Sequence, residues 1–185
     1  MRRIAAALVH YPVHDRSRAV VTSAITNLDL HDISRSSLTY GLSDLFIVHP
    51  VAAQRLLAER VREHWISGSG ARRIPDRTPA ISILRIVTTL DDALAALGPD
   101  AQLWVTSAKG SGELMDFPAA RAELALDGPP VLIVFGTGWG LGDAITNRAH
   151  ARLSSIAGRA ADGYNHLSVR AAAAIIFDRL LSAQR

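Results

Sequence analysis

The feature that most constrains this chain is a series of short, continuous apolar runs that alternate with segments of helical periodicity. Runs that are apolar throughout, rather than at every second residue, are typical of parallel strands buried on both faces. Strands are expected at 4–9, 45–48, 81–87, 103–106 and 131–135, with a short sixth candidate at 151–156. Helices are expected at 28–40, 51–66, 90–97, 113–124 and 168–182. The alternation predicts an α/β fold, a mostly parallel sheet with helices on both faces.

Length and composition narrow the possible classes of protein. A chain of 185 residues is expected to form a single domain, 1–185, and an apolar content of 49% is enough for a real core. The absence of cysteine excludes disulfides, thiolate zinc sites and a cysteine nucleophile. The N-terminal apolar run is too short for a signal peptide, and no stretch is long enough to span a membrane. These properties favour a cytoplasmic protein without a membrane partner.

The net charge of +3 is concentrated in one part of the chain. Between residues 55 and 77 lie six arginines and three acidic residues, an excess equal to the whole net charge. A basic patch of this kind suits a polyanion such as nucleic acid. A solvated helix face followed by a charged loop explains the pattern equally well, and 67–79 is expected to be the longest loop.

In open α/β sheets, ligands bind beyond the carboxyl ends of the strands. The segments that follow the expected strands there are 10–14, 49–51, 107–113 and 135–143. The last of them, FGTGWGLGD, has neither the glycine spacing of the dinucleotide fingerprint nor the lysine of a P-loop. Its glycines permit positive φ and close approach of the main chain to a ligand, and Trp139 can wall such a pocket or cap the sheet. A ligand site read through the main chain is therefore favoured over an ordinary turn.

A second polar stretch, 26–50, lies near the N-terminal end of the chain. Thr26 or Asn27 can cap its helix, and a capped helix needs no function to explain it. Asn27, His31 and Arg35 together nevertheless make this helix more polar than packing alone requires.

A third stretch, 162–178, places Asn165, His166 and Ser168 before a helix N-terminus. Free N–H groups at such a terminus favour anionic or acceptor ligands. The alternative is a simple helix cap, for which Ser168 alone would be sufficient.

Two histidines near the first expected strand, His10 and His14, raise the question of a metal site. A single pair without a third ligand is more often structural, so no metal is expected.

In this order, the three stretches resemble the three motifs of the SpoU–TrmD (SPOUT) superfamily of RNA methyltransferases. TNLDLHDISRSSLTYGLSDLFIVHP is similar to the first motif of the TrmH-like branch, VLIVFGTGWGLGD to the second and SSIAGRAADGYNHLSVRAAAAII to the third. The chain is closer still to a small bacterial and archaeal group described only as SAM-dependent RNA methyltransferases, through ALVHYPV, TNLDLHDI, FGTGWGL and GYNHLSVR. Any one motif is weak, whereas the ordered set is fairly specific and covers most of the chain.

The resemblance implies a C-terminal deep trefoil knot, a homodimer and S-adenosyl-L-methionine as the cofactor. The helix segment 171–176, rich in small residues, fits a subunit interface. By motif match, the residues expected to contact the cofactor are Thr106, Ser107, Phe135, Gly136, Thr137, Gly138, Trp139, Gly140, Leu141, Ile156, Asn165, His166, Leu167 and Ser168.

The resemblance also places Asn27 and Arg35 at catalytic positions of the family. A guanidinium is very hard to deprotonate, so Arg35 is better suited to clamp a phosphate than to act as a base. His31 and His166 are chemically easier bases. Because His166 stands where TrmH-like relatives usually carry asparagine, base methylation and 2′-O-ribose methylation both stay open.

The expected function is therefore that of a SAM-dependent RNA methyltransferase acting on tRNA or rRNA as a homodimer. RNA would be held by the dimer surface itself, with the arginines between 55 and 77 as candidates. A non-catalytic SAM- or RNA-binding protein on the same fold is the alternative. The missing phosphate motifs disfavour a third class, an unrelated nucleotide-binding α/β enzyme.

Overall fold

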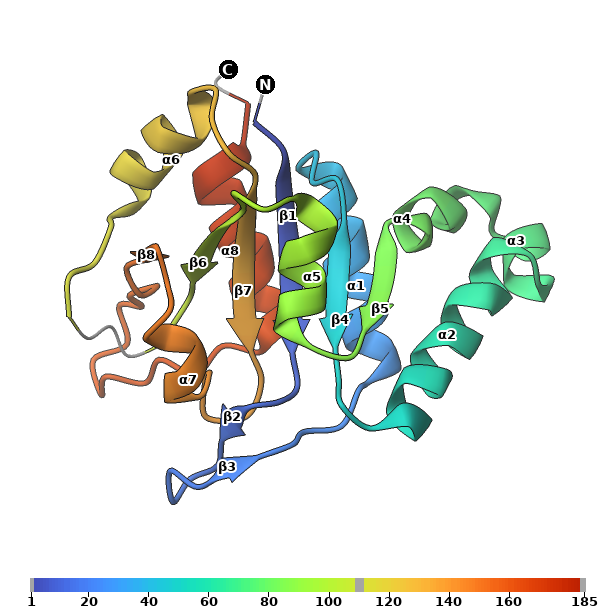
Figure 1. Cartoon of the computed structure of the whole chain (residues 1–185), viewed down its shortest axis with the longest axis horizontal. Helices are drawn as coiled ribbons and strands as arrows, with labels where there is room; N and C mark the ends of the chain where they lie inside the picture. The colour runs from blue at the N-terminus through green and yellow to red at the C-terminus, as the bar shows by residue number, and fades with distance from the viewer. Residues whose placement is uncertain (1, 109–111, 184–185) are drawn as a thin grey trace.

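The computed structural model describes residues 2–108 and 112–183, and its centre is a six-stranded sheet in which all strand pairs are parallel (Figure 1). The strand order is β5-β4-β1-β7-β6-β8. The strands are β1 (Ile4–Val9), β4 (Leu45–Val48), β5 (Leu84–Val87), β6 (Gln102–Val105), β7 (Val131–Gly136) and β8 (Ala151–Arg152). A separate antiparallel pair, β2 (Val13–His14) and β3 (Val20–Val21), lies below the sheet in Figure 1. The predicted α/β fold with a mostly parallel sheet is confirmed.

Helices cover both faces of the sheet, as predicted. They are α1 (Asn27–Thr39), α2 (Ala52–Ile66), α3 (Ser69–Arg73), α4 (Thr78–Ser82), α5 (Leu90–Leu97), α6 (Phe117–Ala125), α7 (Asp143–Thr146) and α8 (Val169–Leu181), with a 3-10 turn, η1, at Pro75–Arg77. One apolar core joins α1, α2, α4, α6 and α8 to one face, and a second joins α5 and α7 to the other. Figure 1 shows α5 in front of the sheet, with α1 and α8 behind it. Within the described ranges, no helix has the length and apolar composition needed to cross a membrane.

Consecutive side chains of β1 enter the two cores in turn. Ala6 and Leu8 lie in the core with α1 and α8, whereas Ala5, Ala7 and Val9 lie in the core with α5. All five are fully buried. A strand between two helical layers has no solvent face, which is why its sequence is apolar at every position.

Capping side chains specify where the helices of the motif stretches begin. Thr26 Oγ1 accepts a hydrogen bond from the Asp29 N–H at 3.2 Å, and Ser168 Oγ accepts one from the Ala171 N–H at 3.2 Å. Each bond satisfies an N–H group that has no partner within the helix. Of the two caps that the sequence allowed for α1, Thr26 and Asn27, the structure assigns Thr26.

Two errors in the predicted elements come from prolines at helix starts. The segment 67–79, expected to be a loop, contains α3, η1 and the beginning of α4. Pro75 and Pro79 lie in the first turns of η1 and α4, where the missing N–H of proline does no harm. Because α4 takes up the start of the strand expected at 81–87, that strand begins only at Leu84.

Two other elements are shorter than predicted. The helix expected at 113–124 begins only at Phe117, because the Asp116 carboxylate caps it by accepting a first-turn N–H at 2.8 Å. The sixth strand, expected at 151–156, exists as β8 but keeps only its first two residues.

Candidate functional site

The carboxyl ends of the parallel strands meet along one edge of the sheet, the carboxyl edge, which is the lower edge in Figure 1. His10 directly follows β1, His49 follows β4 and Thr137 follows β7. Because these strands are neighbours in register, the segments after them lie together, as the sequence predicted. Of the predicted segment 107–113, residues 109–111 lie outside the described part of the chain.

The glycine loop, residues 136–142, needs glycine for two different reasons. Gly138 and Gly140 have φ angles of +59° and +107°, a backbone region that side chains other than glycine rarely adopt. A Cβ atom on Gly136 would lie 2.7 Å from the backbone nitrogen of Leu141. The loop therefore folds back on itself more tightly than any side chain at Gly136 would permit.

Part of the loop backbone pairs with the segment around β2. The Trp139 N–H donates to His14 O at 2.9 Å, and the His14 N–H donates to Gly140 O at 2.9 Å. The Gly142 N–H donates to Pro12 O at 2.9 Å. These bonds fix the shape of the glycine loop and leave ligand contacts to its other peptide groups.

The third motif stretch packs against the glycine loop. The rings of Trp139 and His166 lie edge to face, with their centroids 6.4 Å apart. Asn165 Nδ2 donates to Ile156 O at 2.7 Å, which closes the connection between β8 and α8. The second and third motif stretches therefore lie side by side.

The predicted cofactor residues on and after β6 and β7 have different environments. Thr106 Oγ1 donates to Val134 O at 3.0 Å, whereas Ser107 is exposed. The Phe135 ring is buried in the core, 5.5 Å from the ring of Phe177 on α8. Phe135 can therefore contact a ligand only through its main chain.

The helix of the first motif, α1, lies beside the helix of the third, α8. The Arg170 guanidinium pairs with Asp29 at 3.3 Å and with Asp32 at 3.6 Å. Asn27 and Arg35 are both exposed on α1, about two turns apart. Asn27 and Arg35, two of the three predicted catalytic residues, therefore reach solvent on a helix that adjoins the third motif.

His31 has a different environment from the exposed Asn27 and Arg35. It is buried, and its ring lies edge to face with Trp65 of α2 at 5.1 Å. Burial lowers the pKa of His31, and the positive charge of Arg77 lowers this pKa further. Its Nδ1 has no hydrogen-bond partner among the described residues. The ring is therefore mostly neutral at pH 7 and packs toward α2.

Sequence reasoning missed a buried polar network under the carboxyl edge. His10 Nδ1 and Ser23 Oγ share a hydrogen bond at 2.9 Å. Ser23 Oγ also bonds Thr137 Oγ1, which donates to Val9 O at 3.3 Å. Each hydroxyl has one proton, and Thr137 donates its proton to Val9 O. Ser23 therefore donates to Thr137, and the His10 Nδ1–H donates to Ser23. His10 Nε2 then carries no proton, and it has no partner in the described part of the chain.

His49 completes this network. Its Nδ1 accepts from the Val51 N–H at 3.1 Å, so its Nε2 carries the proton and donates to Ser23 O at 2.9 Å. Its ring stacks on that of His10 at 5.4 Å. Burial lowers the pKa of both histidines, for His10 to about 4, with the nearby His49 as the smaller cause. The one sequence signal for this pair is a histidine directly after each of two buried strands.

The two histidines considered for a metal pair belong to separate hydrogen-bonding networks. His14 Nδ1 donates to Arg18 O at 3.0 Å, and its Nε2 lies 3.4 Å from the Asp143 carboxylate. His10 bonds Ser23 instead. Over residues 2–108 and 112–183, no group of three or more His, Cys, Asp or Glu is placed to hold a metal ion.

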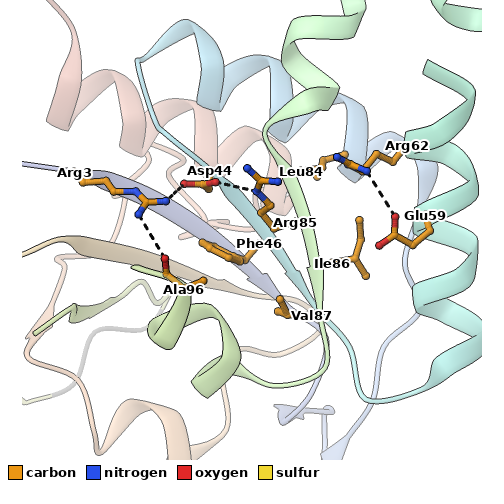
Figure 2. A pocket seen from close by; sticks show the side chains of 10 residues that line it. All are labelled: Arg3, Asp44, Phe46, Glu59, Arg62, Leu84, Arg85, Ile86, Val87 and Ala96. Atoms are coloured by element: carbon orange, nitrogen blue, oxygen red, sulfur yellow. Dashed lines mark hydrogen bonds and ion pairs between the residues drawn. The ribbon is translucent and has the colours of Figure 1, made fainter. Parts of the chain in front are cut away.

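A shallow cavity of about 460 Å³ lies elsewhere, near the amino ends of β1 and β4 and along β5 (Figure 2). Asp44 lies there between Arg3 at 2.6 Å and Arg85 at 3.1 Å. Arg62 approaches Glu59 to 4.0 Å on α2. The acidic groups of this cavity are paired with its basic groups, and no residue of the second or third motif stretch lines it. The cavity is therefore a poorer candidate for the cofactor site than the carboxyl edge.

Comparison with known proteins decides the family. A family model described as SAM-dependent RNA methyltransferase matches residues 3–182, nearly the whole chain and all three motif stretches. The chain belongs to this family of SAM-dependent RNA methyltransferases. The resemblance found in the sequence is thereby confirmed.

Two relatives differ in how much of their own length this chain covers. A protein from Oleidesulfovibrio alaskensis named tRNA (guanine-N(1)-)-methyltransferase is 41% identical over 184 residues, which is 97% of this chain but 42% of that protein. This chain therefore spans less than half the length of that relative, whose name describes the longer protein. An uncharacterized protein from Aquifex aeolicus is 35% identical over 183 residues, and the match covers 97% of this chain and 88% of the other.

A solved structure shows the same fold. The SpoU methyltransferase AviRb from Streptomyces viridochromogenes, in complex with the cofactor AdoMet, superposes with a TM-score of 0.58. Its sequence is 15% identical, and the match covers 97% of this chain and 57% of that protein. The likeness confirms the α/β fold of SpoU methyltransferases for this chain.

The residues at the carboxyl edge fit the cofactor of this family, S-adenosylmethionine. A side chain on Gly140 would meet nothing within 4 Å, so the loop is open to a ligand at that point. Peptide groups of the loop and the Thr106 hydroxyl offer neutral hydrogen bonds. Hydrogen bonds of this kind are what an adenosine group requires.

Proposed function

We propose that this chain binds S-adenosylmethionine at the carboxyl edge and transfers its methyl group to a nucleotide of tRNA or rRNA. The contact between motif stretches that are far apart in sequence carries the proposal. Trp139 of the second motif meets His166 of the third, and Arg170 joins the helices of the first and third. These contacts bring parts of the three motif stretches together, and the glycine loop lies where an α/β sheet is expected to bind a ligand.

When bound, the cofactor supplies a methyl group that its sulfonium already activates. The residues proposed to hold it are Thr106, Ser107, the segment 135–141, Ile156 and the segment 165–168. Their main-chain groups fix the orientation of the cofactor, and a bound nucleotide would exclude water from the methyl group.

The residues of α1 are proposed to position the RNA. Arg35 is exposed and can bind a phosphate group with two parallel hydrogen bonds, while Asn27 orients the nucleotide. Of the two candidate bases, His166 is better placed, because it is exposed at the contact with Trp139. His31 is buried against Trp65 and is the weaker candidate.

We also propose the deep trefoil knot of the SPOUT fold for the C-terminal part. The backbone around β8 supports it, because the Leu153 N–H donates to Val105 O on one side at 2.9 Å. On the other side, the Met115 N–H donates to Arg152 O at 2.8 Å and the Ser154 N–H donates to Met115 O at 2.9 Å. The backbone at 152–154 thus pairs with β6 on one side and with Met115, before α6, on the other.

The proposed active form is a homodimer of the single domain 1–185, located in the cytoplasm. Leu28 and Leu38 on α1 are 59% and 39% exposed, which is high for large apolar side chains. They lie on the helix beside α8, whose segment 171–176 is rich in alanine and partly exposed. A partner subunit would bury this apolar surface.

RNA is proposed to bind the basic segment that projects from the sheet as α2, α3 and η1, at the β5 side in Figure 1. Arg60, Arg72 and Arg73 are exposed there and suit phosphate contacts. Arg55 and Arg77 have internal roles instead: Arg55 donates to backbone carbonyls at 2.9 and 2.6 Å, and Arg77 lies over the Trp65 ring at 4.8 Å. The exposed arginines are therefore the better candidates for RNA contacts.

Two measurements test this function. Calorimetry should detect binding of S-adenosylmethionine and S-adenosylhomocysteine but not of NAD or ATP; the reverse result would contradict the proposed site. Transfer of a labelled methyl group to total RNA separates the enzyme from the alternative, a non-catalytic SAM- or RNA-binding protein, which would bind the cofactor without transfer.

Replacement of Arg35 by alanine tests the proposal that α1 positions the RNA while the loops bind the cofactor. Methyl transfer should fall about a hundredfold or more, since the phosphate clamp is lost, while cofactor affinity stays nearly unchanged. Arg85→Ala, on the edge strand β5, is the matched control and should leave both quantities unchanged. Loss of cofactor affinity in Arg35→Ala would show that Arg35 belongs to the cofactor site.

A further inference from the structure

Three aromatic rings form a cluster on the surface beside the glycine loop. Trp139 and Tyr164 are 51% and 64% exposed, and His166 lies between them. The His166 ring is 6.4 Å from Trp139 at an interplanar angle of 75° and 5.5 Å from Tyr164 at 50°. Large rings are usually buried more deeply than this, so the exposure of this aromatic cluster requires an explanation.

The backbone holds the rings from both sides. On one side, the Trp139 N–H donates to His14 O at 2.9 Å. On the other side, the Tyr164 N–H donates to the Asp162 carboxylate at 3.0 Å, next to Gly163 at a φ of +72°. Backbone hydrogen bonds of this kind favour one arrangement of the rings, and preorganisation lowers the entropy lost on binding.

The exposure of the rings distinguishes between two possible ligands. A small-molecule pocket encloses most of the surface of its ligand, and its walls are recessed. Single-stranded nucleic acid is bound on exposed aromatic side chains, on which unpaired bases stack. Tyr164, which is more exposed than Trp139, also lies outside the set of predicted cofactor residues. The exposure of the rings thus favours an unpaired nucleic-acid base that stacks from the solvent side over a small molecule enclosed by the loops.

The charge near the cluster agrees with a nucleic-acid ligand. Arg159 lies in the same connection between β8 and α8 and is exposed. A guanidinium in this connection can bind the phosphate that accompanies a stacked base.

We propose that the aromatic cluster of Trp139, Tyr164 and His166 is a stacking platform for an unpaired RNA base beside the cofactor site. The proposal rests on the proposed function and narrows its substrate class to nucleotides in single-stranded or opened RNA. Stacking on the platform would hold the target nucleotide, or its neighbour, next to the glycine loop. A base that is paired in a duplex has no free face to offer and would not bind there.

The test uses Tyr164→Ala, with Tyr164→Phe as the variant that keeps the ring. Leu126→Ala is the control, because Leu126 is equally exposed at 60% but follows α6. Fluorescence anisotropy measures affinity for a short single-stranded RNA of mixed sequence and for its duplex. Tyr164→Ala should weaken single-strand binding about tenfold, the usual size for loss of one stacked base. Tyr164→Phe and Leu126→Ala should bind as the wild type does, and duplex affinity should not change.

A spectroscopic measurement separates stacking from a general loss of structure. A base that stacks on Trp139 should quench its fluorescence, so single-stranded RNA should quench the wild type and not Trp139→Phe. Unchanged quenching in Trp139→Phe would overturn the platform, since the signal would then come from Trp65 or Trp104.

Other outcomes also overturn the platform. Equal losses for single strand and duplex would indicate a charge effect, and a loss of S-adenosylhomocysteine affinity alone would assign the rings to the cofactor. A change in subunit association in Tyr164→Ala, with RNA affinity intact, would make the cluster a dimer contact. Failure of the proposed function is distinguishable: no methyl transfer by the wild type, with the tenfold loss in RNA binding still seen, contradicts the enzyme and supports the platform.

Discussion

The two edges of the same sheet handle their polar groups in opposite ways. At the amino edge, Asp44 is only 4% exposed and uses its two oxygens to bind Arg3 and Arg85. The hydrogen bonds to these groups hold its pKa low against the effect of burial, so the edge stays ionised. At the carboxyl edge, the buried side chains of His10 and His49 are neutral. Paired charges thus lie at the amino edge around Asp44, whereas two neutral histidines are buried at the carboxyl edge.

A cavity is therefore a weaker sign of a functional site than buried side chains with perturbed protonation or a backbone conformation that only glycine readily adopts. The cavity at the amino edge is formed by charges that already neutralise one another. The carboxyl edge has two positive-φ glycines in one loop, a buried His10 nitrogen without a described partner, and half-exposed rings. Perturbed protonation of this kind concentrates at functional sites.

The assignment of the cofactor site to the carboxyl edge requires that the glycine loop does not tolerate a side chain. In Gly136→Ala, the new methyl group would lie 2.7 Å from the backbone nitrogen of Leu141, so the loop would have to open. We expect affinity for S-adenosylhomocysteine, measured by calorimetry, to fall about a hundredfold, the size typical of a misplaced binding group.

Gly98→Ala is the matched control for this change. Gly98 ends α5 near the amino edge at a φ of +129°, and a Cβ there would meet nothing within 4 Å. The backbone strain should lower the free energy of unfolding by about 1–2 kcal/mol, with cofactor affinity unchanged. Equal losses of affinity in both variants would mean that the glycine loop has no special relation to the cofactor.

Mild acid should destabilise the protein through His10 at the carboxyl edge. In the unfolded chain His10 takes up a proton below a pKa of 6.5, whereas in the folded protein it does so only near 4. The unfolded state therefore binds more protons in this window, and the free energy of unfolding falls as pH drops from 6.5 toward 4. The loss attributable to His10 should be on the order of 3 kcal/mol, with no further contribution below that window.

Urea unfolding at neutral and mildly acid pH measures this effect. His10→Gln should reduce the dependence of unfolding free energy on pH, and the buried His31 and His49 should account for the part that remains. An acid dependence equal to that of the wild type would show that His10 is not the group that resists protonation.

The sequence predicted those features of this protein that depend on local pattern. The run at β1 is apolar throughout because both of its faces are buried, and that pattern is visible without any knowledge of neighbours. The caps Thr26 and Ser168 are equally local. The motif stretches predicted the family because their order is a property of the chain itself.

Features that depend on strand order could not be predicted in the same way. His10 and His49 are stacked because β1 lies next to β4, a neighbourhood that no single segment encodes. The contact between Trp139 and His166 likewise joins two loops that only the folded chain brings together. The helices within 67–79 are very short and depend on packing against α2, so a composition rich in glycine and proline suggested a loop.

The smallest expected effect concerns the amino edge itself. Asp44→Asn removes a buried charge from between Arg3 and Arg85, but both arginine side chains are about half exposed and can be solvated by water. The loss of unfolding free energy should therefore be about 1–2 kcal/mol, less than for a fully buried pair. Asp91→Asn is the control: its bond to Arg148 joins two exposed side chains, and its loss should stay below about 1 kcal/mol. Because Asp44 lies at the amino edge, Asp44→Asn should bind S-adenosylhomocysteine as the wild type does, and a loss of binding in this variant would show that the two edges are coupled.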